Sequence, residues 1–207
     1  MSKIAIKGNE SGTATFTIEA PATNTDRTFE LPDEAGKVLT NATPGTVLQV
    51  VSTTKTNTQT IFGGVFVDIS GLSVSITPTS ATSKFLILAH VSVSQNGGVN
   101  GADFRFVSVT TAATTAIGIG DADGSKTISS FSGRRGFNSG LQETWSGNYL
   151  DSPGTSLAIT YKVQTRGKLE GSGGPNPEVN INRSRSEGNN TEFSRTTSTI
   201  TVMEIAG

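Results

Sequence analysis

Two aspartates, Asp121 and Asp123, have the spacing of the first ligands in a calcium-binding loop. Such loops place acidic oxygens at alternating positions, use a glycine for the turn and close with a distal glutamate. Gly124 follows the aspartates, but the twelfth position counted from Asp121 is Ser132, which has no carboxylate. Asp121 and Asp123 are therefore weak metal candidates, and a glycine–aspartate hairpin turn is favoured. The sequence predicts no metal site and no cofactor.

Catalysis by a nucleophile or by paired carboxylates has little support. His90 is the only histidine that could activate a serine or threonine, and in a strand it is favoured as a packing or interface residue. A glycosidase needs two carboxyl groups about 5–10 Å apart on either side of a sugar. Nothing marks such a pair among the acidic residues near turns, which are Asp103, Asp121, Asp123, Glu143 and Asp151. We therefore expect a protein without enzyme activity.

Aromatic, amide and basic residues offer a candidate contact with a host receptor. Sugar rings stack on aromatic faces, and amides hydrogen-bond to sugar hydroxyls. The candidate residues are Trp145, Asn148, Tyr149, Arg134 and Arg135. With the polar stretch 182–190, the two arginines are expected in exposed loops, where binding residues often lie. The alternative is that the aromatic residues pack at the rim of a sandwich and the loops are simply solvated.

The composition excludes several functional classes. The 207-residue chain has no cysteine, which excludes disulfides, cysteine-based zinc sites and thiol nucleophiles. Its net charge of −1 gives no overall attraction to nucleic acid or to an anionic membrane. No apolar run approaches the roughly 20 residues that span a bilayer, and the first residues lack the apolar core of a secretory signal. Charged residues are only 16% of the chain, whereas 55 residues are serine or threonine, which suits strands with hydroxyl-rich outer faces.

Strict alternation of apolar and polar residues predicts β-strands throughout the chain. In the segment 72–77, Leu72, Val74 and Ile76 share one face and hydroxyl residues occupy the other. Similar alternation predicts strands in 13–19, 84–94, 102–109, 157–163 and 199–205. No segment has a sustained helical period, and glycine, proline, asparagine and aspartate separate the strands. We therefore predict an all-β fold, an antiparallel β-sandwich or a barrel.

The segment 84–94 is apolar on both faces in its first half. Phe85, Ile87 and the alternate residues that follow share one face, while Leu86, Leu88 and His90 occupy the other. A sandwich strand normally buries one face, so either a loop or another subunit must cover the second one. Leu86, Leu88 and His90 are therefore the candidate oligomer interface. Met203 and Ile205 give weaker support, because they imply either a bulge or a second two-sided strand.

The chain has two parts by composition. Residues 1–43 form a short β-rich segment with too little apolar area for an independent core. We expect this segment to attach to another protein or to the main domain, with Phe16, Ile18, Phe29 and Leu31 as attachment residues. A short linker follows, and residues 46–207 form the β-sandwich domain.

Several segments resemble appendage proteins of tailed bacteriophages, especially marine phages. Residues 11–22 and 27–36 are similar to a segment that is common in phage tail fibres. Later segments resemble a β-sandwich head domain of the same proteins; they are 45–51, 76–84, 150–154, 159–163 and 200–205. The resemblance implies a homotrimeric tail fibre on a virion, with a jelly-roll-like head. The length of 207 residues leaves no room for a long shaft, so a short tail appendage or a capsid-bound fibre is implied.

Three functional hypotheses follow. The first is a homotrimeric virion appendage that attaches through residues 1–43 to another virion protein and presents its head to a host glycan or protein, without binding nucleic acid or inserting into a membrane. Its variant is a capsid-bound head fibre or decoration protein. The second is a tailspike that degrades polysaccharide, and the third is a secreted cellular adhesin or lectin.

Overall fold

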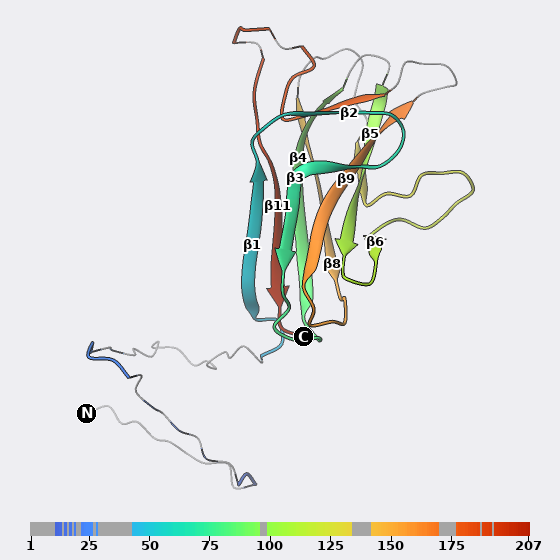
Figure 1. Ribbon diagram of the computed structural model, residues 1–207. Coiled ribbons are helices and arrows are strands. Elements are labelled where there is room, and N and C mark those ends of the chain that lie inside the picture. Colours follow the sequence, from blue (N-terminus) through green and yellow to red (C-terminus); the bar gives the residue numbers. More distant parts are fainter. Residues whose placement is uncertain are drawn as a thin grey trace. The chain divides into compact units, whose positions relative to one another are not determined.

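The computed structural model (Figure 1) describes most of the chain from residue 43 onward and part of the first 28 residues. The described residues are 11–13, 15, 17, 19, 22–26, 28, 43–95, 99–133, 142–169, 177–186, 188–191 and 193–207. The chain forms two compact units, Met1–Lys37 and Val38–Gly207. The sequence places the boundary a few residues later, at 43–46.

In the first unit, the described residues of the predicted strand 13–19 are not in a strand. These residues are Thr13, Thr15, Thr17 and Glu19, and all four are exposed. The predicted attachment residues Phe16, Ile18, Phe29 and Leu31 lie outside the described residues, so their role stays a prediction.

The second unit is built from antiparallel strands. The strands are β1 Val47–Lys55, β2 Gln59–Phe62, β3 Val67–Ile76, β4 Lys84–Gln95, β5 Val99–Val109, β6 Thr114–Ile117, β7 Phe131–Gly133, β8 Glu143–Asp151, β9 Ile159–Leu169, β10 Glu178–Ile181 and β11 Ser198–Ile205. The described residues contain no helix, and hence none that is long and apolar enough to cross a membrane. The prediction of an all-β sandwich is confirmed.

The strands form two sheets, here called sheet A and sheet B. In sheet A, β1 pairs with β11 and β2 pairs with β10, while β11 and β10 both pair with β4. The strand β8 pairs with the opposite edge of β4. In sheet B, β3 pairs with β9, β9 with β5, and β5 with both β6 and β7.

This pairing gives a jelly roll. Sheet A has the order β1/β2, β11/β10, β4, β8, and sheet B has the order β3, β9, β5, β6/β7. Paired strands are therefore mostly distant in the sequence, and of the described pairs only β5 and β6 are consecutive strands. Two sheets connected in this way are the jelly-roll arrangement of viral capsid and lectin domains.

The core lies between the two sheets and follows the predicted alternation. In β4 the inward residues from Phe85 to Val93 are buried. Tyr161 of β9 faces them, and its ring centroid is 5.9 Å from that of Phe85. The Tyr161 hydroxyl donates a hydrogen bond of 2.8 Å to Asp151, and burial together with this carboxylate raises the pKa of Tyr161.

Three aromatic rings pack directly on glycine residues where β8 meets the segment between β5 and β8. The Phe131 ring lies against Gly147, where an added Cβ would be 2.3 Å from a ring atom. The Trp145 indole lies in the same way against Gly133, and the Tyr149 ring against Gly118. Only glycine allows these close contacts, so the three glycines fix the packing of this edge.

A buried carboxylate anchors the end of the sandwich near the C-terminus. Glu204 of β11 is fully buried and accepts hydrogen bonds of 2.6 and 2.7 Å from the backbone nitrogen and hydroxyl of Thr79. Gln49 Nε2 donates a further bond of 2.6 Å. Burial alone would raise the pKa of Glu204, but donors on Ser83, Thr79 and Gln49 hold this pKa below its ordinary value.

Candidate functional site

An apolar row crosses the outer face of sheet A. Residues opposite each other in neighbouring antiparallel strands share a face of the sheet. Val50 of β1 is opposite Met203 of β11, and Met203 is opposite Leu86 of β4. Leu86 is in turn opposite Leu150 of β8. The two ends of the row are the most open, because Val50 is 55% exposed and Leu150 is 47% exposed.

Three further apolar side chains extend this row. Val47 is opposite Ile205 on the same face, and Leu88 follows Leu86 on the outer side of β4. We call these seven residues the sheet A patch: Val47, Val50, Leu86, Leu88, Leu150, Met203 and Ile205.

The predicted interface residues all lie on this outer face. Leu86 and Leu88 are half-buried, and His90 is exposed. The register between β11 and β4 runs without a shift from Thr199 to Ile205. The apolar residues at the end of β11 therefore face outward on a regular two-sided strand, and the sequence alternative of a bulge in β11 is wrong.

The outward positions around the sheet A patch are almost free of charge. Among the described outward positions from Lys84 to His90 along β4 and those in register with them, Lys84 is the only residue with a full charge at neutral pH. The other residues beside the patch are Ser52, Thr54, His90, Ser146, Asn148, Thr199 and Thr201. A surface with so few charged side chains is typical of the core of a protein interface.

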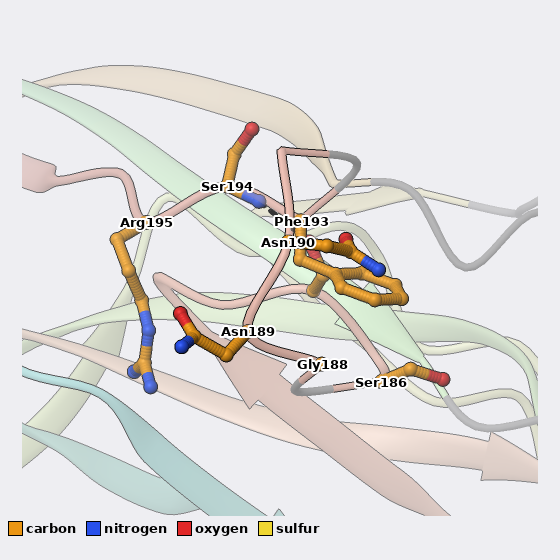
Figure 2. Close-up of a pocket in the computed structure, with 8 residues that line it drawn as sticks. Ser186, Gly188, Asn189, Asn190, Phe193, Ser194 and Arg195 are labelled. Atoms are coloured by element: carbon orange, nitrogen blue, oxygen red, sulfur yellow. Dashed lines mark hydrogen bonds between the residues drawn. The ribbon is translucent and has the colours of Figure 1, made fainter.

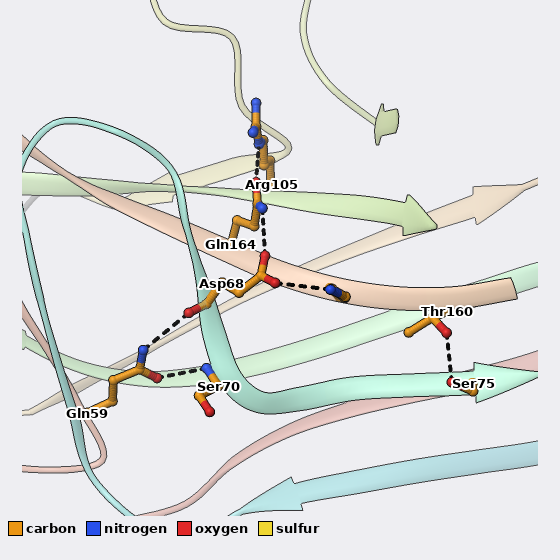
Figure 3. Close-up of polar contacts among 8 residues, drawn as sticks. Gln59, Asp68, Ser70, Ser75, Arg105, Thr160 and Gln164 are labelled. Carbon is orange, nitrogen blue, oxygen red and sulfur yellow. Dashed lines mark hydrogen bonds and ion pairs between the residues drawn. The ribbon is translucent and has the colours of Figure 1, made fainter. Parts of the chain in front are cut away.

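The outer face of sheet B has the opposite character. Asp68 of β3 accepts hydrogen bonds from Gln164 Nε2 at 2.6 Å and from Lys162 Nζ at 3.1 Å, both on β9. Arg105 of β5 donates to Gln164 Oε1 at 2.7 Å, which continues the network across the sheet (Figure 3). Burial would raise the pKa of Asp68, but its Gln164, Lys162 and Arg105 neighbours lower it below the ordinary value.

A second charged group lies further along β5 and β9. The carboxylate of Asp103 is 2% exposed, and its two oxygens pair with different cations. Arg166 Nε lies 3.0 Å from one oxygen, and Lys168 Nζ lies 2.8 Å from the other. The two outer faces of the sandwich therefore differ: sheet A carries the apolar patch with Lys84 beside it, and sheet B carries a network of ion pairs.

The structure does not bring the candidate receptor residues of β8 together. Trp145 and Tyr149 point inward and pack against the hydrophobic core, while Asn148 is exposed on the outer face. The Trp145 indole is edge-on to the Phe104 ring at 5.7 Å, and its Nε1 donates to Glu143 at 3.1 Å. This is the packing alternative that the sequence left open. Arg134 and Arg135 lie outside the described residues.

The acidic candidates are either exposed or engaged by donors on neighbouring strands. Asp121 and Asp123 are exposed, and Asp123 pairs with Lys126. Within the described residues, no three side chains of the metal-binding types lie close enough together to hold an ion. The carboxylates of Asp103 and Asp151 are used by Arg166, Lys168 and Tyr161 in contacts that hold strands together.

A polar pocket of about 290 Å³ lies in the connection between β10 and β11 (Figure 2). The half-buried Phe193 ring packs on Gly188, where an added Cβ would lie 2.6 Å from a ring atom. Ser194 donates its backbone N–H to Ser184 Oγ at 3.2 Å. The pocket is lined by Ser184, Ser186, Gly188, Asn189, Asn190, Phe193, Ser194 and Arg195. The stretch 182–190 marks half of this pocket in the sequence, but Phe193 and Arg195 lie beyond it.

Comparison with known proteins identifies no family. No protein-family model matches the sequence, and no curated protein matches it. Among solved structures, infectious bursal disease virus strain Gt has a TM-score of 0.39 and 13% identity, over 77% of this chain and 38% of the other. The VP2 subviral particle of that virus has a TM-score of 0.39 and 14% identity, over 75% of this chain and 37% of the other. The chain thus spans less than two fifths of these structures, and similarity this low does not show a shared function.

Proposed function

We propose that this chain is a non-enzymatic structural protein of a virus particle. In this proposal it is a homotrimeric appendage of a tailed bacteriophage that attaches through residues 1–43 and presents its β-sandwich to the host surface. The sequence resemblance to phage tail fibres supports the particle, the trimer and the attachment segment. The jelly-roll topology supports a role in particle structure or in sugar binding, because both kinds of protein use it.

The sheet A patch is the observation on which the oligomer depends. Monomeric proteins rarely leave a continuous apolar surface across a whole sheet, and such surfaces mark interaction sites. Burying the exposed half of a Val50 or Leu150 side chain contributes about 1 kcal/mol each, from the range for full burial. The single charged neighbour, Lys84, adds little desolvation cost. We therefore place the contact between like subunits on the outer face of sheet A.

Light scattering on the purified full chain tests this assignment. The proposal expects a mass of three times 21.4 kDa at micromolar concentration. Leu86→Asp should reduce the mass to that of one chain, because it places a charge in the centre of the apolar row. Val65→Asp is the matched control, since Val65 is 75% exposed in the β2–β3 connection and outside the patch. A wild-type monomer, or a Leu86→Asp protein that stays trimeric, contradicts the proposed interface.

Adhesion is the proposed activity of the assembled particle. Several weak sites on one particle bind a multivalent surface much more tightly than one site does, so each head needs only modest affinity. The β10–β11 pocket offers hydroxyl, amide and aromatic groups of the types that contact neutral sugars. Wild-type trimer should bind host cells more strongly than Phe193→Ala trimer, and it should release no reducing ends from host polysaccharide. Release of reducing ends would support the tailspike hypothesis instead.

The position of this chain on the virus particle distinguishes a tail fibre from the alternative, a head fibre or decoration protein. Imaging of particles that carry this chain with a C-terminal label should place the label at the tail. A label on the capsid would favour the decoration protein.

A further inference from the structure

We propose that a pocket on sheet B binds the oxyanion of an acidic saccharide. We call it the basic pocket; its lining residues are Lys126, Thr127, Arg166 and Lys168. Three of these residues carry positive charge and none is acidic, although the chain as a whole has a net charge of −1. The proposal does not depend on the trimer or on the β10–β11 pocket.

A buried carboxylate positions two of the cations. Asp103 is 2% exposed and fixes Arg166 through Nε and Lys168 through Nζ, one on each oxygen. Arg166 is further held by a bond of 3.1 Å from Nη1 to the backbone oxygen of Gly64. The two side chains remain 24% and 36% exposed, so their heads are held by the protein and still reach solvent. Such pre-organised cations lose little freedom when an anion binds.

The charge balance of the basic pocket favours an anion. Asp103 neutralises only one of the two charges on Arg166 and Lys168, and at the rim Lys126 is balanced by Asp123, so the group keeps a net charge of +1. A guanidinium has five N–H donors and an ammonium has three. The contacts of Arg166 with Asp103 and Gly64 use two of its donors, and the contact of Lys168 with Asp103 uses one. Thr127 also lines the pocket, and cationic N–H donors of this kind match sulfate, phosphate or carboxylate oxygens.

The volume indicates that the oxyanion belongs to a larger molecule. The basic pocket has a volume of about 360 Å³, whereas one water occupies about 30 Å³ of liquid. A bare oxyanion would leave most of this space to solvent, and the volume falls in the range of small-molecule sites. The lining combines three cationic heads and a threonine with the aliphatic stems of the same long side chains. This mixture suits a saccharide, which has both hydroxyl groups and apolar ring faces.

One rim contact competes with the ligand. Lys126 forms an ion pair with Asp123, and both side chains are largely exposed. A bound oxyanion would have to share Lys126 with this carboxylate. Removing the Asp123 charge should therefore strengthen binding, which a merely structural ion pair would not predict.

The test is calorimetric titration of the full chain with a sulfated heparin tetrasaccharide, with neutral maltotetraose and inorganic sulfate as comparison probes. Asp123→Asn should tighten binding of the sulfated probe about two- to fivefold, the range of one exposed ion pair. Asp121→Asn is the matched control, because it removes the same charge from the same loop at a residue that takes part in none of the described ion pairs. Lys126→Gln should weaken binding by a similar factor, and Lys84→Gln on sheet A should leave it unchanged.

The proposal expects saturable binding of the sulfated tetrasaccharide, competition by inorganic sulfate and no binding of maltotetraose. Equal effects of Asp123→Asn and Asp121→Asn would overturn it, since they would indicate a general charge effect. Binding of free sulfate without binding of the tetrasaccharide would overturn the saccharide assignment. Because the readout is per site, a monomeric protein that binds would refute the trimer and leave the basic pocket intact.

Discussion

Glu204 provides the sharpest prediction of stability, because a buried carboxylate is held by hydrogen-bond donors and not by a cation. In the described ion pairs no lysine or arginine pairs with it, and its donors are Thr79 and Gln49, with Ser83 beside them. The substitution Glu204→Gln keeps the shape of the side chain. It also replaces one acceptor oxygen by an NH₂ group that faces the donor Nε2 of Gln49.

The magnitude follows from the contacts. The two bonds from Thr79 can persist to the amide oxygen, but they lose the strength that a charged acceptor gives. The bond from Gln49 is lost, unless Gln49 turns and gives up its 2.8 Å bond to the oxygen of Thr77. One hydrogen bond to a charged group is worth about 1.5–3 kcal/mol. We expect Glu204→Gln to lower the free energy of unfolding by about this amount at pH 7.

The pH dependence gives a second signature. The pKa of Glu204 is lower in the folded protein than in the unfolded chain, where a glutamate has a pKa of about 4.3. Its stabilisation is therefore fully present above that pH and is lost as the pH falls through the folded pKa. The stability difference between wild type and Glu204→Gln should thus shrink between about pH 5 and pH 3.

Urea denaturation followed by circular dichroism at several pH values measures both effects. Glu19→Gln is the matched control, because Glu19 is exposed and the same change there should alter stability by less than about 0.5 kcal/mol. The reasoning fails if Glu204→Gln is as stable as wild type at pH 7. It also fails if the stability difference stays constant down to pH 3.

Three further outcomes are expected. Gly147→Ala should destabilise the sandwich by about 1–3 kcal/mol in urea denaturation because the new Cβ meets Phe131, while Gly120→Ala, with nothing within 4 Å, should be nearly neutral. Asn182 has a φ of 60° and forms hydrogen bonds through its side chain. Asn182→Gly should lose only these bonds, whereas Asn182→Ala should lower the free energy of unfolding by about 1 kcal/mol more in the same assay. Equal losses would contradict a contribution from the left-handed backbone. Deletion of residues 1–43 should leave a cooperative unfolding transition by circular dichroism, and its absence would show that the sandwich needs this segment.

Alternation predicts strands best where one face is apolar. The strands at 84–94, 102–109 and 199–205 are found almost as predicted, because their inward residues are large and apolar. The predicted strand at 157–163 ends too early, since β9 continues to Leu169. Its inward residues there include Thr165 and Gly167, so the apolar signal fades although pairing with β5 continues.

The start of β3 also differs from the prediction, because of the local backbone geometry at Gly71. The predicted strand begins at Leu72, but β3 begins at Val67. Gly71 has φ 77, and the register with β9 shifts between Asp68 and Ser73. The glycine therefore marks a bulge within a strand, whereas in the sequence it reads as the end of one.

The sites depend on contacts between distant residues, which no local pattern reveals. The sequence marks Leu86 and Leu88, but the sheet A patch exists only because β1, β8 and β11 align with β4. In the sequence, Trp145, Asn148 and Tyr149 look like a binding motif. In the structure the Trp145 indole packs against Gly133, and no local pattern in the sequence marks Gly133 as its partner. The basic pocket likewise joins residues about forty positions apart, Lys126 and Arg166.

The hydrogen bonds that close the sandwich join its first and last residues. Gly45 donates to the oxygen of Ala206 at 2.8 Å, and Ala206 donates to the oxygen of Thr46 at 2.9 Å. The β10–β11 connection lies at the other end of the sandwich (Figure 1). A short peptide could therefore link residue 207 to residue 44, and new ends could be opened in the exposed turn near Gly154. Such a circularly permuted sandwich would keep every strand pair, whereas residues 1–43 would no longer be joined to it at residue 44.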